Sequence, residues 1–384
     1  MSPCCVSRDT LNKSADEFFH LSEDGLLEAF HSESMNKLRN DLLTGTKHKN
    51  CEVCWQEEKC GQQSKRQREN LRFQEYTDRI LKTSQELERP ISLDLKLGNL
   101  CNLKCRICGP NNSSKWMEEA VRFGHPDQLT RPNKKLKNMP AEESRKIINN
   151  WPSYAEKFWT DLESCLPGIE LLEIFGGEPM LNKRHFELLK KSVADGWSKK
   201  QNIHYNTNGT TLPPEEILKD VFPQFKQVNI MLSVDGTGRR FEYQRYPAKF
   251  DALLENFEKY RSYGFEPQIC ITVSVLTVYH IFEDLEFWKS KNAFVYLNML
   301  YEPYEFDIRY MSESAKAAVE TKKSLYEDFS KYPRLLNNYQ AVFNHMHSQA
   351  EVVKTAEMFA VLQKIDEYRK QDFKTVFSDW ADKF

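Results

Sequence analysis

The sequence lacks the features of a membrane or secreted protein. No run of about 18 apolar residues occurs in its 384 residues, so no membrane-spanning helix is predicted. The N-terminal stretch MSPCCVSRDT has no apolar core of the signal-peptide type, and we expect a cytoplasmic protein. The chain also has no large excess of charge of either sign, because 54 Lys and Arg are balanced by 56 Asp and Glu. This balance argues against a generic nucleic-acid partner.

Cysteine is scarce in most of the chain and concentrated at its start. Of the ten cysteines, only Cys165 and Cys270 lie beyond residue 108. Cysteine used as a small apolar residue would be scattered, so this clustering indicates chemistry. In a reducing compartment, metal ligands and free thiols are the expected uses, rather than disulfides.

The pattern of apolar segments divides the chain. Residues 1–88 indicate polar helices without a strand-rich block, whereas strands alternate with helices from Pro90 onward. Such alternation predicts a parallel α/β sheet, with apolar strands covered on both faces. The predicted strands are 91–98, 169–175, 202–209, 227–236, 266–276 and 294–300. The predicted helices are 62–88, a broken stretch over 112–165, then 183–197, 213–222, 250–264, 281–291 and a helical region from 312 to 384.

Polar and thiol side chains follow the first four predicted strands. Because ligands bind at the carboxyl ends of parallel strands, these residues are candidates for one site. They are Cys101 after the first strand, Gly176, Gly177 and Glu178 after the second, Asn206 and Asn208 at the third, and Ser233 and Asp235 at the fourth.

The segment NLCNLKCRICG carries three cysteines with C-x3-C-x2-C spacing: Cys101, Cys105 and Cys108. A structural zinc site would normally need a fourth Cys or His, and His48 and His125 lie at no recognisable ligand spacing. An iron–sulfur cluster is held by thiolates, and three of them leave one iron open for a further ligand. Incidental loop cysteines are the alternative.

This motif, placed directly after the first strand of a βα series, resembles the radical S-adenosylmethionine (radical SAM) superfamily. The family usually has an aromatic residue before the last cysteine, where this chain has Ile107. The resemblance implies a partial, open (β/α)6 TIM-like barrel. It also implies that Cys101, Cys105 and Cys108 hold a [4Fe–4S] cluster to which SAM binds.

Two further segments carry the same resemblance. The first is the GGEP stretch, Gly176 to Pro179, which the resemblance implies contacts the amino group of SAM. The second is MLSVDGTGRRFEYQRYP, in which Ser233 and Arg245 are implied to bind the ribose and carboxylate of SAM. The resemblance also places Asn206 and Asn208 in the SAM pocket, and Asp235 is a weaker candidate. The alternatives are turn formation by Asn and Gly, capping by Asp235, and a surface ion pair of Arg245. The implied cofactor-binding residues are Gly176, Gly177, Glu178, Pro179, Asn206, Asn208, Ser233, Asp235 and Arg245.

The N-terminal cysteines form a second group. Cys51, Cys54 and Cys60 have C-x2-C-x5-C spacing, and the adjacent Cys4 and Cys5 precede them. The segment resembles the cysteine-bearing part of radical SAM proteins with twitch or SPASM auxiliary domains, which implies a second iron–sulfur cluster. Which of Cys4, Cys5 and Cys60 complete the ligand set stays open, and zinc or a decayed site is the alternative.

The resemblance implies one-electron reductive cleavage of SAM to a 5′-deoxyadenosyl radical that abstracts hydrogen from a substrate, with no catalytic side chain required. We expect the substrate to be a peptide or protein. We also expect a flavodoxin- or ferredoxin-like partner to supply the electron. A nucleotide or small-metabolite substrate, or a non-catalytic iron–sulfur or zinc protein, is the alternative. The expected divisions are 1–88 (auxiliary segment), 89–305 (radical SAM core, helical insertion at 112–165) and 306–384 (helical).

Overall fold

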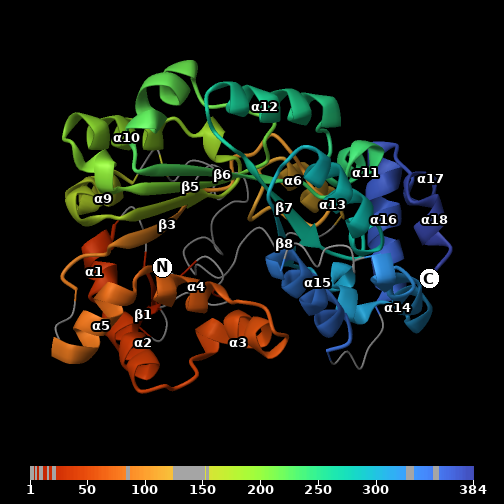
Figure 1. Ribbon diagram of the computed structural model, residues 1–384, viewed down its shortest axis with the longest axis horizontal. Helices are drawn as coiled ribbons and strands as arrows, with labels where there is room; N and C mark the ends of the chain where they lie inside the picture. The colour runs from red at the N-terminus through yellow and green to blue at the C-terminus, as the bar shows by residue number, and fades with distance from the viewer. Residues whose placement is uncertain are drawn as a thin grey trace.

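The computed structural model describes residues 4, 7, 12–14, 17–19, 23–83, 87–123, 152, 155–325, 333–348 and 354–384. Most of the predicted insertion at 112–165 lies outside these ranges. Its two ends are helical, as α6 (Trp116–Phe123) and α9 (Glu156–Cys165). The centre of the molecule is a curved sheet of six parallel strands (Figure 1).

The six strands follow one another in chain order, β3-β4-β5-β6-β7-β8, and every neighbouring pair is parallel. This confirms the predicted α/β class and all six predicted strands, as an open, partial TIM-like barrel. The strands are β3 (Ser92–Lys96), β4 (Leu171–Phe175), β5 (Asn202–Thr207), β6 (Gln227–Ser233), β7 (Gln268–Val273) and β8 (Val295–Met299).

The two faces of the sheet differ in chemistry, contrary to the expectation of strands that are apolar on both faces. In β5, Ile203 and Tyr205 are fully buried, whereas the alternating residues His204 and Asn206 are only partly buried. Side chains alternate across a strand, so one face packs against helices and the other surrounds a polar interior. The barrel interior is therefore available for a ligand.

Helices cover the outer face and connect the strands. The predicted helix at 213–222 is instead a π-helical turn, η6 (Ile217–Val221). The connecting helices are α10 (Arg184–Ala194), α11 (Gly238–Gln244), α12 (Phe250–Ser262) and α13 (Ile281–Ser290).

The N-terminal region is mainly helical, as predicted, with two differences. A two-stranded antiparallel hairpin joins β1 (Asn12–Ser14) to β2 (Glu17–Phe18). The helix predicted over 62–88 begins later, behind a capping box at Ser64, and is interrupted at Phe73. The helices are α1 (Leu26–Phe30), α2 (Glu33–Leu43), α3 (Glu52–Lys59), α4 (Lys65–Arg72) and α5 (Gln74–Thr83).

The start of α4 reaches the barrel interior at both edges of the sheet. The Lys65 ammonium forms ion pairs with Asp94 of β3, at 3.3 Å, and with Glu173 of β4. The Gln62 amide donates to the Leu297 carbonyl of β8 at 3.4 Å. The order of the sheet places β3 and β8 at opposite ends, so this extension spans the open side of the barrel (Figure 1).

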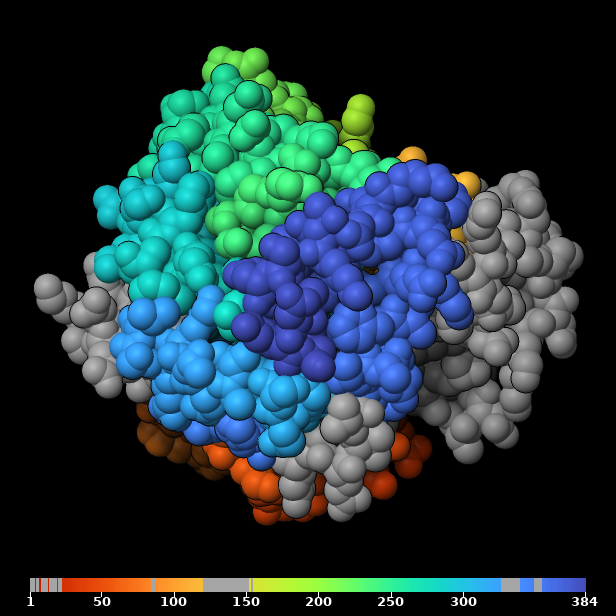
Figure 2. Space-filling model, turned by 90° about the vertical axis from the view of Figure 1, so that its right-hand side faces the viewer, coloured from red at the N-terminus to blue at the C-terminus, as the bar shows by residue number. Residues whose placement is uncertain are grey.

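The C-terminal region is helical, as predicted, and packs on the β7–β8 side. Figure 2 shows the last residues lying against the segment around residue 240. The helices are α14 (Glu313–Glu320), α15 (Pro333–Met346), α16 (Thr355–Arg369), α17 (Phe373–Val376) and α18 (Ser378–Ala381). Among the described residues, no helix has the length and apolarity that spanning a bilayer requires. The three-part division of the chain stays a prediction.

The Lys65 ion pairs predict a stability effect. Lys65→Ala leaves Asp94 and Glu173 as neighbouring carboxylates without their ammonium, so we expect about 3 kcal/mol lower free energy of unfolding in urea. Lys190→Ala removes an exposed pair with Glu216 and should cost below about 0.5 kcal/mol. Equal effects of the two substitutions would contradict a stabilising role of the Lys65 cluster.

Candidate SAM and iron–sulfur site

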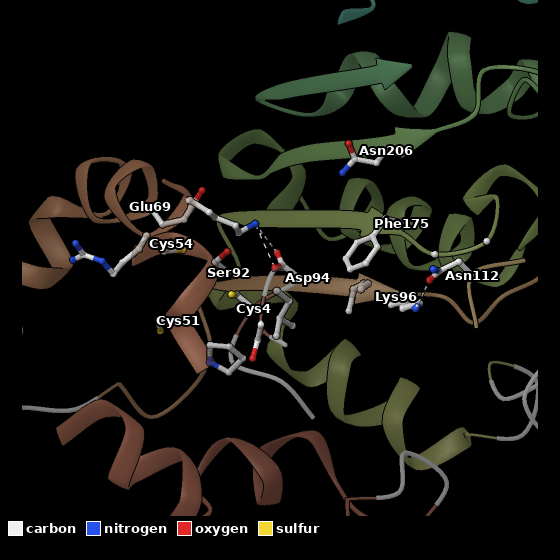
Figure 3. Close-up of a pocket in the computed structure, with 18 of the residues that line it drawn as sticks. Cys4, Cys51, Cys54, Glu69, Ser92, Asp94, Lys96, Asn112, Phe175 and Asn206 are labelled. Carbon is white, nitrogen blue, oxygen red and sulfur yellow. Dashed lines mark hydrogen bonds and ion pairs between the residues drawn. The ribbon is translucent and has the colours of Figure 1, made fainter. Parts of the chain in front are cut away.

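A cavity of about 1110 Å³ occupies the barrel interior and extends to the N-terminal helices (Figure 3). The three cysteines of the C-x3-C-x2-C motif line it, together with residues from the strand ends and the N-terminal extension. Of the predicted site residues, the lining includes Cys4, Cys51, Cys54, Cys101, Cys105, Cys108, Gly176, Gly177, Asn206, Asn208, Ser233 and Arg245. One cavity thus joins both cysteine groups and most of the predicted SAM site.

The cysteine loop places Cys101 and Cys105 in buried positions and Cys108 in a partly buried one. The Leu103 amide donates to Cys101 Sγ at 3.4 Å, and Asn208 Nδ2 lies 3.9 Å from the same sulfur. Burial raises the pKa of the Cys101 thiol to about 11. Donors directed at sulfur suit a thiolate ligand, because cluster sulfurs accept such hydrogen bonds.

Cys105 and Cys108 are close enough to affect one another. Contact with Cys108, together with burial, raises the pKa of Cys105, whereas contact with Cys105 lowers that of Cys108. Within the described ranges, no three Cys, His, Asp or Glu side chains converge tightly enough to hold a single metal ion.

The two glycines of GGEP serve the packing of the cysteine loop. Gly176 and Gly177 have φ of +94° and +56°, and a side chain on Gly177 would collide with the Leu100 carbonyl. That carbonyl accepts a hydrogen bond from the Glu178 amide at 2.7 Å. The glycines therefore allow the end of β4 to approach the chain just before Cys101, and they still line the cavity.

Glu178 is placed differently from the expected ligand position. It is 1% exposed and is not among the cavity-lining residues. Its carboxylate accepts hydrogen bonds from Thr207 Oγ1 and the Asn208 amide, both at 2.7 Å, and from the Met180 amide at 3.1 Å. Burial raises its pKa to about 7. Glu178 thus joins the ends of β4 and β5, and Pro179, also buried, starts the 3₁₀ turn η4 (Pro179–Leu181).

The two predicted asparagines at the end of β5, one in the strand and one just after it, have separate surroundings. Asn206 of β5 and Phe175 of the neighbouring strand β4 both line the cavity (Figure 3). Asn208 Nδ2 donates to Asn102 Oδ1 at 2.8 Å, and its Oδ1 accepts from the Thr210 amide at 2.9 Å. Asn208 therefore secures the cysteine loop as well as lining the cavity.

Arg245 is the buried cation of the site. Its Nη2 lies 2.7 Å from Asp235 Oδ2, and Nη1 donates toward Cys105 Sγ at 3.9 Å. Burial alone would lower its pKa, but Asp235 and the nearby thiols raise it. Its Nε is buried without a hydrogen-bond partner among the described residues, so one donor is available to a ligand. Asp235 accepts from the Thr272 amide at 2.9 Å and lies behind the lining, whereas Ser233 is part of it.

The N-terminal cysteines separate into two places. Cys4, Cys51 and Cys54 line the cavity (Figure 3), and Cys54 is near enough to Cys51 to raise the pKa of its thiol. Cys60 is not among the lining residues and instead contacts His345 of α15, which lowers the pKa of its thiol. Cys5 lies outside the described residues. Burial raises the pKa of Cys51 and Cys54, and a hydrogen bond from the Arg66 amide acts in the opposite direction on the pKa of Cys54.

The sequence did not predict the charged residues that line the cavity beside the cysteines. Asp94 and Lys65 line it, from the middle of β3 and the first turn of α4. A Lys in a charged helix has no local signal that distinguishes it from a solvated residue. An acidic residue in an apolar strand is such a signal, and Asp94 and Glu173 both interrupt predicted strands.

The geometry defines a parallel α/β barrel whose strand ends surround a cysteine-lined, cation-bearing cavity. A family model of the radical SAM superfamily matches residues 95–292, which cover just over half of the chain. The chain belongs to the radical SAM superfamily. The family implies a [4Fe–4S] cluster and SAM, and the thiols and their donors fit these groups.

Solved structures resemble the fold. Native anSMEcpe with bound AdoMet has a TM-score of 0.42 and 21% identity over 63% of this chain and 62% of that chain. Streptococcus suis SuiB bound to S-adenosylmethionine has a TM-score of 0.40 and 14% identity, covering 77% and 60%. SuiB with the precursor peptide SuiA has a TM-score of 0.36 and 12% identity, covering 94% and 67%. The chain thus spans less than two thirds of anSMEcpe. No curated protein matches.

The raised pKa of the buried Glu178 carboxyl group predicts that stability depends on pH. Its folded pKa of about 7 lies above the ordinary value of 4.5, so its contribution is full below pH 4.5 and is lost as pH rises through 7. Glu178→Gln does not titrate, so its free energy of unfolding should fall less over this range than that of the wild type. Urea titrations at several pH values test this, with the exposed Glu187→Gln as control. Parallel curves for Glu178→Gln and wild type would contradict it.

Proposed function

We propose that this chain cleaves SAM reductively at a [4Fe–4S] cluster held by Cys101, Cys105 and Cys108. One observation carries the proposal: the three thiols line a single cavity with the strand-end residues, and N–H donors are directed at two of them. The cluster and SAM, when bound, would supply a 5′-deoxyadenosyl radical that abstracts hydrogen from a substrate. The protein's own groups bind, orient and exclude water.

All of the predicted SAM-binding residues except Pro179 have a role in this proposal. Arg245 binds the SAM carboxylate, because its Nε is a buried donor without a protein partner. Ser233 serves the ribose, and Gly176 and Gly177 meet the amino group through their main chain. Glu178 and Asp235 do not contact SAM in this proposal. Glu178 holds the strand ends together, and Asp235 holds Arg245 in place. Asn206 and Asn208 complete the wall.

We further propose an auxiliary iron–sulfur cluster, of the twitch or SPASM kind, at Cys4, Cys51 and Cys54. These cysteines line the same cavity as the first group, and Cys54 receives an amide donor at the start of α4. Cys60 is not in the proposed set, because its thiol faces His345. The auxiliary cluster would transfer an electron or bind substrate.

The proposed substrate is a peptide or protein. The cavity extends from the strand-end residues to the N-terminal helices, and we place the substrate on the side of the proposed SAM site that faces those helices. Enzymes with auxiliary clusters often modify peptides, and the resemblance of the N-terminal segment favours that class over a nucleotide or small metabolite. A flavodoxin- or ferredoxin-like donor would supply the electron, and a cytoplasmic location suits the nine described free thiols.

Anaerobic reconstitution tests the first cluster. We expect the wild type to bind about eight iron atoms per chain, or about four if only one cluster forms, and to release 5′-deoxyadenosine from SAM when reduced. The variant with Cys101, Cys105 and Cys108 all changed to Ala should lose about four iron atoms and all cleavage. Wild-type protein that holds a cluster but releases no 5′-deoxyadenosine would refute the enzyme proposal.

The second cluster has a matched control in the same segment. Cys51→Ser combined with Cys54→Ser should lower iron from about eight to about four atoms per chain, because two cavity-lining thiols are lost. Cys60→Ser should leave the iron content unchanged. Iron loss in Cys60→Ser, or none in the double variant, would contradict the proposed ligand set.

A further inference from the structure

Two basic residues flank Cys105 in the cysteine loop, and both are held by buried carboxylates. The Arg106 side chain is 0% exposed, and its Nη2 lies 2.5 Å from Asp366 Oδ1 of α16. Its Nε donates to the Tyr243 carbonyl at 3.0 Å, and its guanidinium carbon lies 3.4 Å from the Tyr243 ring centroid. On the other flank, Lys104 Nζ lies 2.5 Å from Glu119 Oε1.

Both carboxylates are connected to the helix α16, one as part of it and the other through an ion pair. Glu119 is paired in turn with Arg369, whose Nε and Nη2 lie 3.1 and 2.9 Å from its carboxylate oxygens. Asp366 and Arg369 are three positions apart in α16 and therefore lie on one face of it. The helix thus holds both flanks of Cys105 through largely buried ion pairs.

Asp366 is itself held rigidly. Its Oδ2 accepts hydrogen bonds from the Tyr243 hydroxyl at 3.1 Å and from the Phe373 amide, at the start of α17, at 2.8 Å. Its other oxygen is therefore directed at Arg106. A buried residue whose own position is fixed in this way can transmit that position to its partner.

The same contacts position Arg245. The Lys104 amide donates to the Tyr246 carbonyl at 2.8 Å and the Arg106 amide to the Gln244 carbonyl at 2.9 Å. Arg245 lies between these two acceptors, so the cysteine loop and the proposed carboxylate-binding residue form one hydrogen-bonded unit. Asp366 contacts that unit at two residues that pack against each other, Arg106 and Tyr243.

We propose that Asp366 is a positioning residue that sets the geometry of the cysteine loop and Arg245, and thereby the binding of SAM to the cluster. This inference rests on the proposed function of Cys101, Cys105 and Cys108. Asp366 lies outside the residues that match the superfamily, 95–292. The C-terminal helices therefore act on the site, beyond covering the barrel.

The test compares Asp366→Asn with a matched control, using reconstituted full-length protein. Asp284→Asn is the control, because Asp284 is also buried and pairs with Arg240 at 3.1 Å without touching the cysteine loop. The readouts are iron content, the EPR spectrum of the reduced cluster with and without SAM, and the dissociation constant of SAM. Melting temperature reports general destabilisation.

We expect Asp366→Asn to weaken SAM binding about tenfold or more and to alter the SAM-induced EPR change, since loss of an outer partner typically costs 10- to 100-fold. Asp284→Asn should destabilise the fold without either effect. A second variant, Arg106→Gln with Asp366→Asn, removes both charges and so avoids a buried unpaired guanidinium. It should recover stability but keep the altered EPR change.

Each alternative result has a distinct meaning. Wild-type SAM affinity and EPR change in Asp366→Asn, or in the double variant if the single one does not fold, would overturn the positioning role. Equal changes in Asp284→Asn would also overturn it, because general loosening would then explain them. A wild type that forms no cluster would instead refute the proposed function on which the inference rests.

Discussion

The cysteine loop must present three thiols to a cavity, so it has no regular secondary structure to satisfy its own main chain. Neighbouring segments of the chain supply those hydrogen bonds instead. The Glu178 amide binds the Leu100 carbonyl, Lys104 and Arg106 donate to the segment after β6, and the Trp116 indole donates to the Cys105 carbonyl at 2.8 Å. The geometry of the proposed cluster site therefore depends on contacts from β4, α6 and the segment after β6.

This constraint explains why several motif residues act indirectly. The glycines of GGEP permit a close approach of two loops, and the Glu178 carboxylate is occupied by three internal donors. Asp235 neutralises Arg245 in a buried setting where an unpaired guanidinium would be costly. The motif residues that line the cavity are the thiols, Gly176, Gly177, Ser233, the asparagines and Arg245.

The interior of the barrel is closed by residues far away in the chain. Lys65 of the N-terminal extension pairs with Asp94 and Glu173, and Asp366 and Arg369 of the C-terminal helices reach the flanks of Cys105. The N-terminal extension thus contributes residues to the cavity lining, whereas the C-terminal helices hold the cysteine loop from outside the lining. The cavity's two groups of cysteines also come from different parts of the chain, and only their shared lining relates them.

The sequence by itself determined the βα alternation, the six strands and the placement of polar residues at strand ends, because these follow from local periodicity and chain order. It also identified the cysteine motif, whose spacing is local. Only the tertiary structure decided that Glu178 and Asp235 lie behind the cavity, that Cys60 faces His345 rather than Cys51 and Cys54, and that Lys65, Arg106 and Asp366 are buried ion-pair partners. The physical reason is that burial and pairing of a charged residue depend on partners up to 260 positions away, which leave no trace in the local pattern.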